Sequence, residues 1–68
     1  MLFRKHTGET FREFLTGRRI AHAKFLLRDL SLNIADIAHR TGFSDAGYFS
    51  RRFKERTAMT PRQWRHGL

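Results

Sequence analysis

The stretch GFSDAGYFSRRF, residues 42–53, is the most informative part of this sequence. Phe49 and Phe53 recur at the i, i+4 spacing that places two side chains on one face of a helix, and Ala46 falls close to them. The opposite face carries small residues followed by positive charge: Gly47, Ser50, Arg51 and Lys54. Residues 45–57 are therefore predicted to form a helix with an aromatic inner face and a basic outer face.

A second, shorter helix is predicted just before it, over residues 33–41. Asn33 is a good N-cap, and Asp36 at position N3 adds negative charge to the first turn, where the helix dipole favours it. Gly42 follows this helix, and Ser44 is the expected N-cap of the next one. Two short helices joined by a tight turn that contains glycine form a helix-turn-helix.

Two further helices are predicted on either side of this pair. Thr60 and Pro61 favour the start of a short final helix, because threonine is a good N-cap and proline suits the first helical position. Trp64 is expected to anchor that helix against the core. Upstream, Thr10 is followed three residues later by Glu13, which is the capping-box pattern at the start of a helix.

The upstream helix, expected over residues 11–28, carries an apolar stripe that shifts along its length. At about 100° per residue, its apolar residues fall on two sides: Phe11, Phe14, Leu15 and Phe25 on one, and Ile20, Ala23, Leu26 and Leu27 mostly on the other. A shifting stripe indicates a helix that bridges two packing units, with burial of one wide face in a single bundle as the alternative. Because no strand alternation is found, the predicted fold class is all-α.

Length and composition limit the classes of function. The chain has 68 residues, no cysteine and a formal net charge of +8, which favours one small domain with a polyanionic partner. The lack of cysteine is compatible with a cytoplasmic location, and no apolar run approaches the roughly 18 residues of a membrane span. No catalytic constellation, phosphate loop or zinc-ligand spacing is found. We therefore expect no enzyme activity, no cofactor, no metal, no membrane partner and no small-molecule site.

The basic outer face of residues 45–57 has two interpretations. Its small residues would let the backbone approach the bases of a DNA major groove, and Arg51 could form forked contacts with guanine or phosphate. Arg52 and Lys54 would contact phosphates. A basic face that is merely solvated is the alternative. The net charge and the order of helix, turn and helix favour the DNA interpretation.

The residues also resemble a known family. The segment NIADIAHRTGFSDAGYFSRRFKERTAMTPRQWR, residues 33–65, is similar to the second helix-turn-helix of the AraC/XylS family of bacterial transcription regulators. The family pattern combines I-A-x-I-A, G-F-S-[DE], Y-F-x-R-x-F-[KR] and G-x-T-P-x-x-[YW]-R. Upstream, RRIAHAKFLLRD resembles the linker helix of the family, and LFRKHTGETFREFL resembles the end of the first helix-turn-helix and the start of the linker.

This resemblance implies a homeodomain-like three-helix unit after a long linker helix, with a short helix at the start of the chain. Residues 1–9 would be a remnant of the first recognition helix, residues 10–30 the linker helix, and residues 31–68 the second helix-turn-helix unit. It implies a transcription regulator that binds double-stranded DNA with residues 45–57 in the major groove. RNA polymerase or a related regulator is the implied protein partner.

The resemblance suggests the candidates for base contacts, and the pattern of the residues themselves suggests those for phosphate contacts and for the core. The candidates for base contacts are Asp45, Ala46, Gly47, Ser50 and Arg51. The candidates for phosphate contacts are Asn33, Arg40, Arg52, Lys54, Thr60 and Arg62. The expected core of the helix-turn-helix is Ile34, Ile37, Ala38, Phe43, Phe49, Phe53 and Trp64.

Two departures from the family pattern leave alternatives open. Ala58 stands where the pattern has glycine, and if this position is left-handed, alanine costs on the order of 1 kcal/mol there. Among the candidates for base contacts, Ala46 and Gly47 have no hydrogen-bonding side chain. The alternatives are a fragment that binds DNA only non-specifically, or a small interaction module. Such a module would act through an apolar patch made of Met1, Leu2, Phe3, Phe11 and Phe14.

Overall fold

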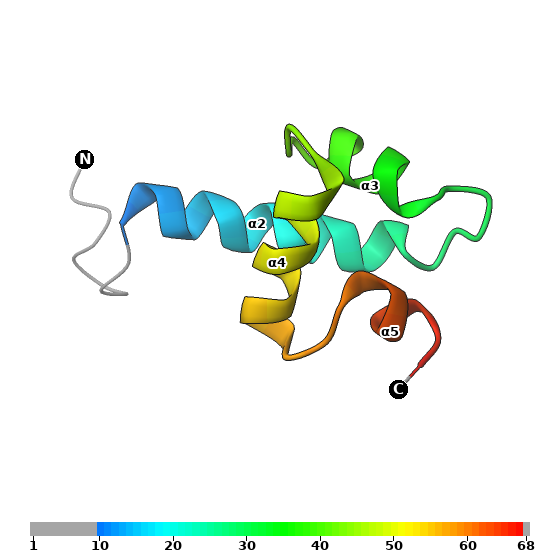
Figure 1. Ribbon diagram of the computed structural model, residues 1–68. Coiled ribbons are helices and arrows are strands. Elements are labelled where there is room, and N and C mark those ends of the chain that lie inside the picture. The colour runs from blue at the N-terminus through cyan, green and yellow to red at the C-terminus, as the bar shows by residue number, and fades with distance from the viewer. Residues whose placement is uncertain (1–9, 68) are drawn as a thin grey trace.

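The computed structural model describes residues 10–67, and every regular element within this range is a helix. The helices are α2 (Phe11–Leu26), α3 (Ile34–Arg40), α4 (Ala46–Thr57) and α5 (Pro61–Arg65). In Figure 1, α4 crosses in front of the long α2, with α3 above and α5 below this crossing. The predicted all-α class, with a long helix followed by a three-helix unit, is confirmed. The short helix and the remnant expected over residues 1–9 lie outside the described residues.

Reciprocal capping fixes the start of three of these helices. In each, the side chain at the N-cap accepts a hydrogen bond from the backbone N–H three residues on, and the side chain there accepts one from the N-cap backbone. The pairs are Thr10 with Glu13, Asn33 with Asp36, and Thr60 with Gln63. The predicted N-caps of α2, α3 and α5 are therefore confirmed, as is proline at the start of α5.

The predicted cap of α4 is wrong by one residue. Asp45, not Ser44, is the N-cap, with extended backbone angles, and its Oδ1 accepts the backbone N–H of Tyr48 at 2.9 Å. The helix therefore begins at Ala46. Asp45 combines the acceptor of a cap with a negative charge at the positive end of the helix, which serves both needs of this terminus.

The long helix α2 also ends earlier than expected, at Leu26 rather than Arg28. The N–H of Arg28 bonds the carbonyl of Phe25 at 3.2 Å, which tightens the last turn. Arg65 of α5 donates hydrogen bonds to two backbone carbonyls just beyond the end of α2. Its Nε donates to Leu27 O and its Nη2 to Asp29 O, both at 3.0 Å. A side chain from the far end of the domain thus satisfies backbone groups that the helix leaves open.

The turn between α3 and α4 requires its glycine. The N–H of Phe43 bonds the carbonyl of Ala38 at 2.9 Å, and the N–H of Gly42 bonds that of His39 at 3.1 Å. This pair of bonds is the Schellman motif, which needs a left-handed residue, and Gly42 has a φ of 92°. The side chain of Arg19 lies over the same glycine, because a Cβ there would sit 2.9 Å from Arg19 Nε.

The core lies where α2 is crossed by α3 and α4. Its buried apolar residues are Ile20, Ala23, Leu27, Ile37, Ala38, Phe43, Phe49 and Phe53. Of the expected core residues, Ile34 and Trp64 are partly buried against this cluster instead of being fully enclosed. Aromatic rings run through it from Phe43 to Phe49, Phe53 and Trp64, with centroids 5.2, 5.8 and 5.8 Å apart. Lys24 of α2 covers the Trp64 ring at 4.9 Å.

Only one of the two apolar sides of α2 enters this core. Ile20, Ala23 and Leu27 are buried, whereas Phe25 on the other side is 67% exposed. The division of the stripe predicted from the sequence is therefore confirmed within α2. That the helix bridges to a second packing unit stays a prediction.

Ala58 follows α4 with a φ of 68°, which is the left-handed conformation. Among the described residues it is the one non-glycine residue with a positive φ. Ala58→Gly should raise the free energy of unfolding by about 1 kcal/mol, because glycine adopts this conformation without a Cβ clash. For a domain of this size, that corresponds to a rise in melting temperature of about 4–8 °C. Thermal unfolding followed by circular dichroism measures it.

The same substitution elsewhere provides the control. Ala21 is exposed in the interior of α2, where glycine should lower stability by about 1 kcal/mol. A melting temperature that falls in both variants would contradict the strain assigned to Ala58.

Candidate nucleic-acid interface

The candidate interface is the side of α4 that faces away from the core, together with the residues around its N-terminus. Phe49 and Phe53 hold the inner side of the helix in place. The outer side begins at the N-cap and runs over the first two turns through the candidates for base contacts: Asp45, Ala46, Gly47, Ser50 and Arg51. Asp45, Gly47 and Arg51 are exposed, and Ala46 and Ser50 are half-buried.

These five residues are not equally available to a ligand. One carboxylate oxygen of Asp45 is used as the helix cap. The methyl group of Ala46 packs against the core, so this residue is only half accessible. Gly47 has no side chain, so the helix backbone itself forms the surface at this point. A Cβ added there would lie 3.1 Å from Asp45 Oδ1. Ser50 and Arg51 therefore supply the polar side chains that are not caps.

Tyr48 organises the arginines of this face, a role that was missed from the sequence. Arg51 and Arg52 both approach its ring, with their guanidinium carbons 5.9 and 5.8 Å from the ring centroid. Such cation–π contacts lower the freedom of the long side chains before any ligand arrives. The signal in the sequence is the i, i+3 and i, i+4 spacing from Tyr48 to the two arginines.

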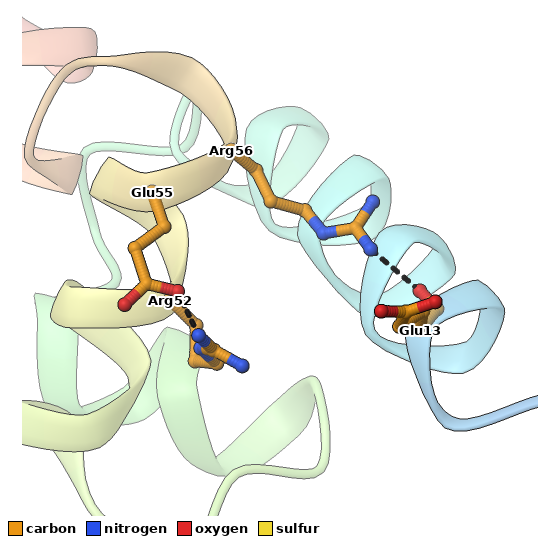
Figure 2. A network of polar contacts seen from close by, with 4 residues as sticks. All are labelled: Glu13, Arg52, Glu55 and Arg56. Atoms are coloured by element: carbon orange, nitrogen blue, oxygen red, sulfur yellow. Dashed lines mark hydrogen bonds and ion pairs between the residues drawn. The ribbon is translucent and has the colours of Figure 1, made fainter. Parts of the chain in front are cut away.

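Arg52 also forms an ion pair with a carboxylate. Its Nη2 forms an ion pair with Glu55 Oε1 one turn further on, as Figure 2 shows. Both side chains are substantially exposed, so the pair contributes little to stability. It does offset part of the positive charge that Arg52 would offer to a phosphate, whereas Lys54 is exposed on the outer side.

The other candidates for phosphate contacts fall into separate places. Thr60 and Arg62 line a shallow hollow beside Ser50, together with Ile34 and Pro61. Asn33, the N-cap of α3, precedes Ile34 in the chain and is itself exposed. Arg40 is exposed in the last turn of α3. The structure thus brings Ser50, Thr60 and Arg62 together at one hollow. Asn33 and Arg40 are exposed at separate points of the surface.

The charge of Arg40 also has a small electrostatic effect on Asp29, in the connection between α2 and α3. The hydroxyl and backbone N–H of Ser31 donate to Asp29 Oδ1 at 2.6 and 3.0 Å. These two bonds, with smaller contributions from the charges of Arg40 and Arg65, hold the pKa of the Asp29 carboxyl below its usual range.

Within the described range, residues 10–67, no group of three potential His, Cys, Asp or Glu ligands gathers around one point. No helix in this range is long and apolar enough to cross a membrane.

Comparison with known proteins identifies the domain. A family model described as a helix-turn-helix domain matches residues 1–67. The transcriptional activator RhaR of Escherichia coli K12, an HTH-type regulator, is 47% identical over 64 residues. This chain belongs to the AraC/XylS family of helix-turn-helix regulators. RhaR of Shigella flexneri serotype 5b matches with the same identity and length.

Solved structures agree with this assignment. The C-terminal domain of the two-component response regulator yesN from Fusobacterium nucleatum superposes with a TM-score of 0.86 at 38% identity, covering 94% of this chain and 62% of that one. A Listeria innocua protein of unknown function gives 0.84 at 38% identity, covering 96% of this chain and 62% of that one. The relative RhaR is a transcription regulator of the helix-turn-helix type, and the family model that matches this chain is a helix-turn-helix domain.

The match covers a small part of the curated relatives. The aligned residues make up 94% of this chain but 23% of RhaR. What RhaR does as a whole protein therefore bears on this chain only as a proposal.

Proposed function

We propose that this AraC/XylS chain binds double-stranded DNA sequence-specifically, with α4 in the major groove. The observation that carries the proposal is the division of α4 into a buried aromatic side and an outer side of small and cationic residues. A major groove admits one α-helix, and a low surface near the N-terminus of that helix lets its backbone approach the bases. Family membership supports the same role.

In this proposal Arg51 makes the principal base contact. Its guanidinium carries a forked set of donors that matches O6 and N7 of guanine. Ser50 and the uncommitted part of the Asp45 carboxylate are weaker candidates, and Ala46 and Gly47 contribute by shape. One strong base-contacting side chain predicts a short and permissive recognition sequence.

Phosphate contacts would hold the helix in its groove without specifying sequence. Ser50, Thr60 and Arg62 are neighbours at one hollow, which supports a phosphate contact there. Lys54 is an exposed cation one turn beyond Arg51 on the same side of α4. Asn33 and Arg40 would act from α3, and Arg52 would contribute less because Glu55 pairs with it.

The proposal extends to location and protein partners. A regulator of this kind would act in the cytoplasm, with RNA polymerase or a related regulator as its partner. The relative RhaR is described as a transcriptional activator, which supports such a partner for the class of protein.

A selection experiment tests the proposal. The chain is titrated against a pool of random duplex oligonucleotides at rising salt, and the bound fraction is sequenced. We expect an enriched motif that survives at about 150 mM salt, since base contacts add to the electrostatic attraction. Binding that enriches no sequence and is lost with salt would reject sequence-specific recognition and favour a fragment with non-specific affinity only.

A further inference from the structure

Arg56 connects the end of α4 to the start of α2. It lies in the last turn of α4, and its Nη2 donates to the backbone carbonyl of Glu13 in the first turn of α2 at 2.7 Å. Figure 2 shows the side chain extended across the space between the two helices. The two residues are 43 positions apart in the sequence, so the bond depends entirely on the tertiary fold.

Gly17 provides the space for this side chain. A Cβ placed on Gly17 would lie 2.9 Å from Arg56 Nη1, which is closer than real Cβ contacts allow. Gly17 stands in the interior of α2, where glycine disfavours the helix relative to alanine. The glycine is thus unfavourable for the helix but permits the guanidinium to lie against it.

The Glu13 end of this contact lies about two turns of α2 from the main packing point of the two helices. α2 enters the core through Ile20 and Ala23, and α4 through Phe49 and Phe53. Glu13 precedes Ile20 by seven residues, which is about 10 Å along a helix axis. A single packing point leaves the crossing angle free to rock, and a second point at a distance restrains it.

We propose that Arg56 is a positioning residue that restrains the angle between α4 and α2 through its seat at Gly17 and Glu13. The inference rests on the proposed function, because the angle matters where α4 presents its outer side to DNA. Arg56 contributes to DNA affinity because it fixes the orientation of α4, and not because it contacts a phosphate. The base-contacting residues would then meet the groove in one orientation.

A double-mutant cycle in thermal stability tests the contact itself. Gly17→Ala, Arg56→Ala and the double variant are unfolded by heat and followed by circular dichroism. In the Arg56→Ala background, Gly17→Ala should raise the melting temperature by about 4 °C or more, as expected when alanine replaces glycine inside a helix. In the wild-type background the methyl group must displace the Arg56 guanidinium and its bond to Glu13, so the gain should be smaller. Equal gains in both backgrounds would overturn the contact.

The salt dependence of DNA binding tests the positioning role. Affinities are measured at a temperature where every variant is folded, so that stability alone does not change them. Arg56→Ala should weaken binding by about five-fold at each salt concentration, within the range expected for coupled residues, and leave the slope of log K against log salt unchanged.

Lys54→Ala is the matched control, because it removes one positive charge from the same helix. Its slope should fall by about one unit if Lys54 contacts a phosphate. A reduced slope for Arg56→Ala as well, or an affinity equal to that of the wild type, would overturn the positioning role.

The two proposals fail in different ways. If the wild-type chain does not bind DNA, the proposed function and the positioning role both fall, whatever the thermal cycle shows. If the wild type binds but Arg56→Ala fails either test, only the inference about Arg56 falls.

Discussion

Phe53→Ala should leave this chain largely unfolded at 25 °C. The Phe53 side chain is 0% exposed and packs between Phe49 and Trp64, with ring centroids 5.8 Å away on both sides. Removing a buried phenyl ring costs about 3–5 kcal/mol. A core in a domain of this length rarely supplies more than about 3–5 kcal/mol, so the variant should keep no net stability. Far-UV circular dichroism and chemical denaturation measure the outcome.

Phe25→Ala is the matched control for that experiment. The chemical change is identical, but Phe25 is 67% exposed on the side of α2 that does not enter the described core. We expect its stability to stay within about 0.5 kcal/mol of the wild type. Similar losses in the two variants would contradict the assignment of the core to one side of α2.

Most of the fold was predictable because its signals are local. Each reciprocal cap joins residues three positions apart, and the inner side of α4 is visible in the spacing of Phe49 and Phe53. The left-handed residue after α4 was also accessible, through the departure of Ala58 from the family pattern. Signals of this kind need no knowledge of what the helices pack against.

The boundaries were harder because neighbouring residues offer equivalent chemistry. Ser44 and Asp45 are both good N-caps, and the backbone angles that choose between them depend on how the preceding turn closes at Gly42. The end of α2 likewise depends on Arg65, which binds carbonyls 36 and 38 positions away. No pattern within α2 carries that information.

The same limit explains what the sequence missed at the candidate interface. The outer side of α4 follows from its periodicity, but the destination of each arginine does not. Arg52 pairs with Glu55, whereas Arg56 and Arg65 bind backbone carbonyls at the two ends of α2. Counting basic residues therefore overstated the number of side chains available for direct contacts with DNA, because a long side chain can reach several partners and the fold selects among them.

Arg51→Ala should abolish most of the sequence preference of the chain. Arg51 is exposed on the outer side of α4, and Tyr48 holds its guanidinium near the ring. A forked arginine–guanine contact discriminates against other bases by about 1–3 kcal/mol, which is roughly 5-fold to more than 100-fold in affinity. Binding to the selected motif should fall by that factor relative to unrelated duplex DNA, whose binding loses only the electrostatic contribution of one charge. Competition titrations with both duplexes measure the difference.

Lys54→Ala separates base recognition from charge. It removes the same positive charge from the same exposed side, one turn further along α4. Because a phosphate contact is independent of sequence, this variant should weaken binding to the motif and to unrelated DNA by equal factors. Equal losses of preference in the two variants would show that Arg51 does not contact a base, and that any recognition comes from DNA shape or from the backbone of α4.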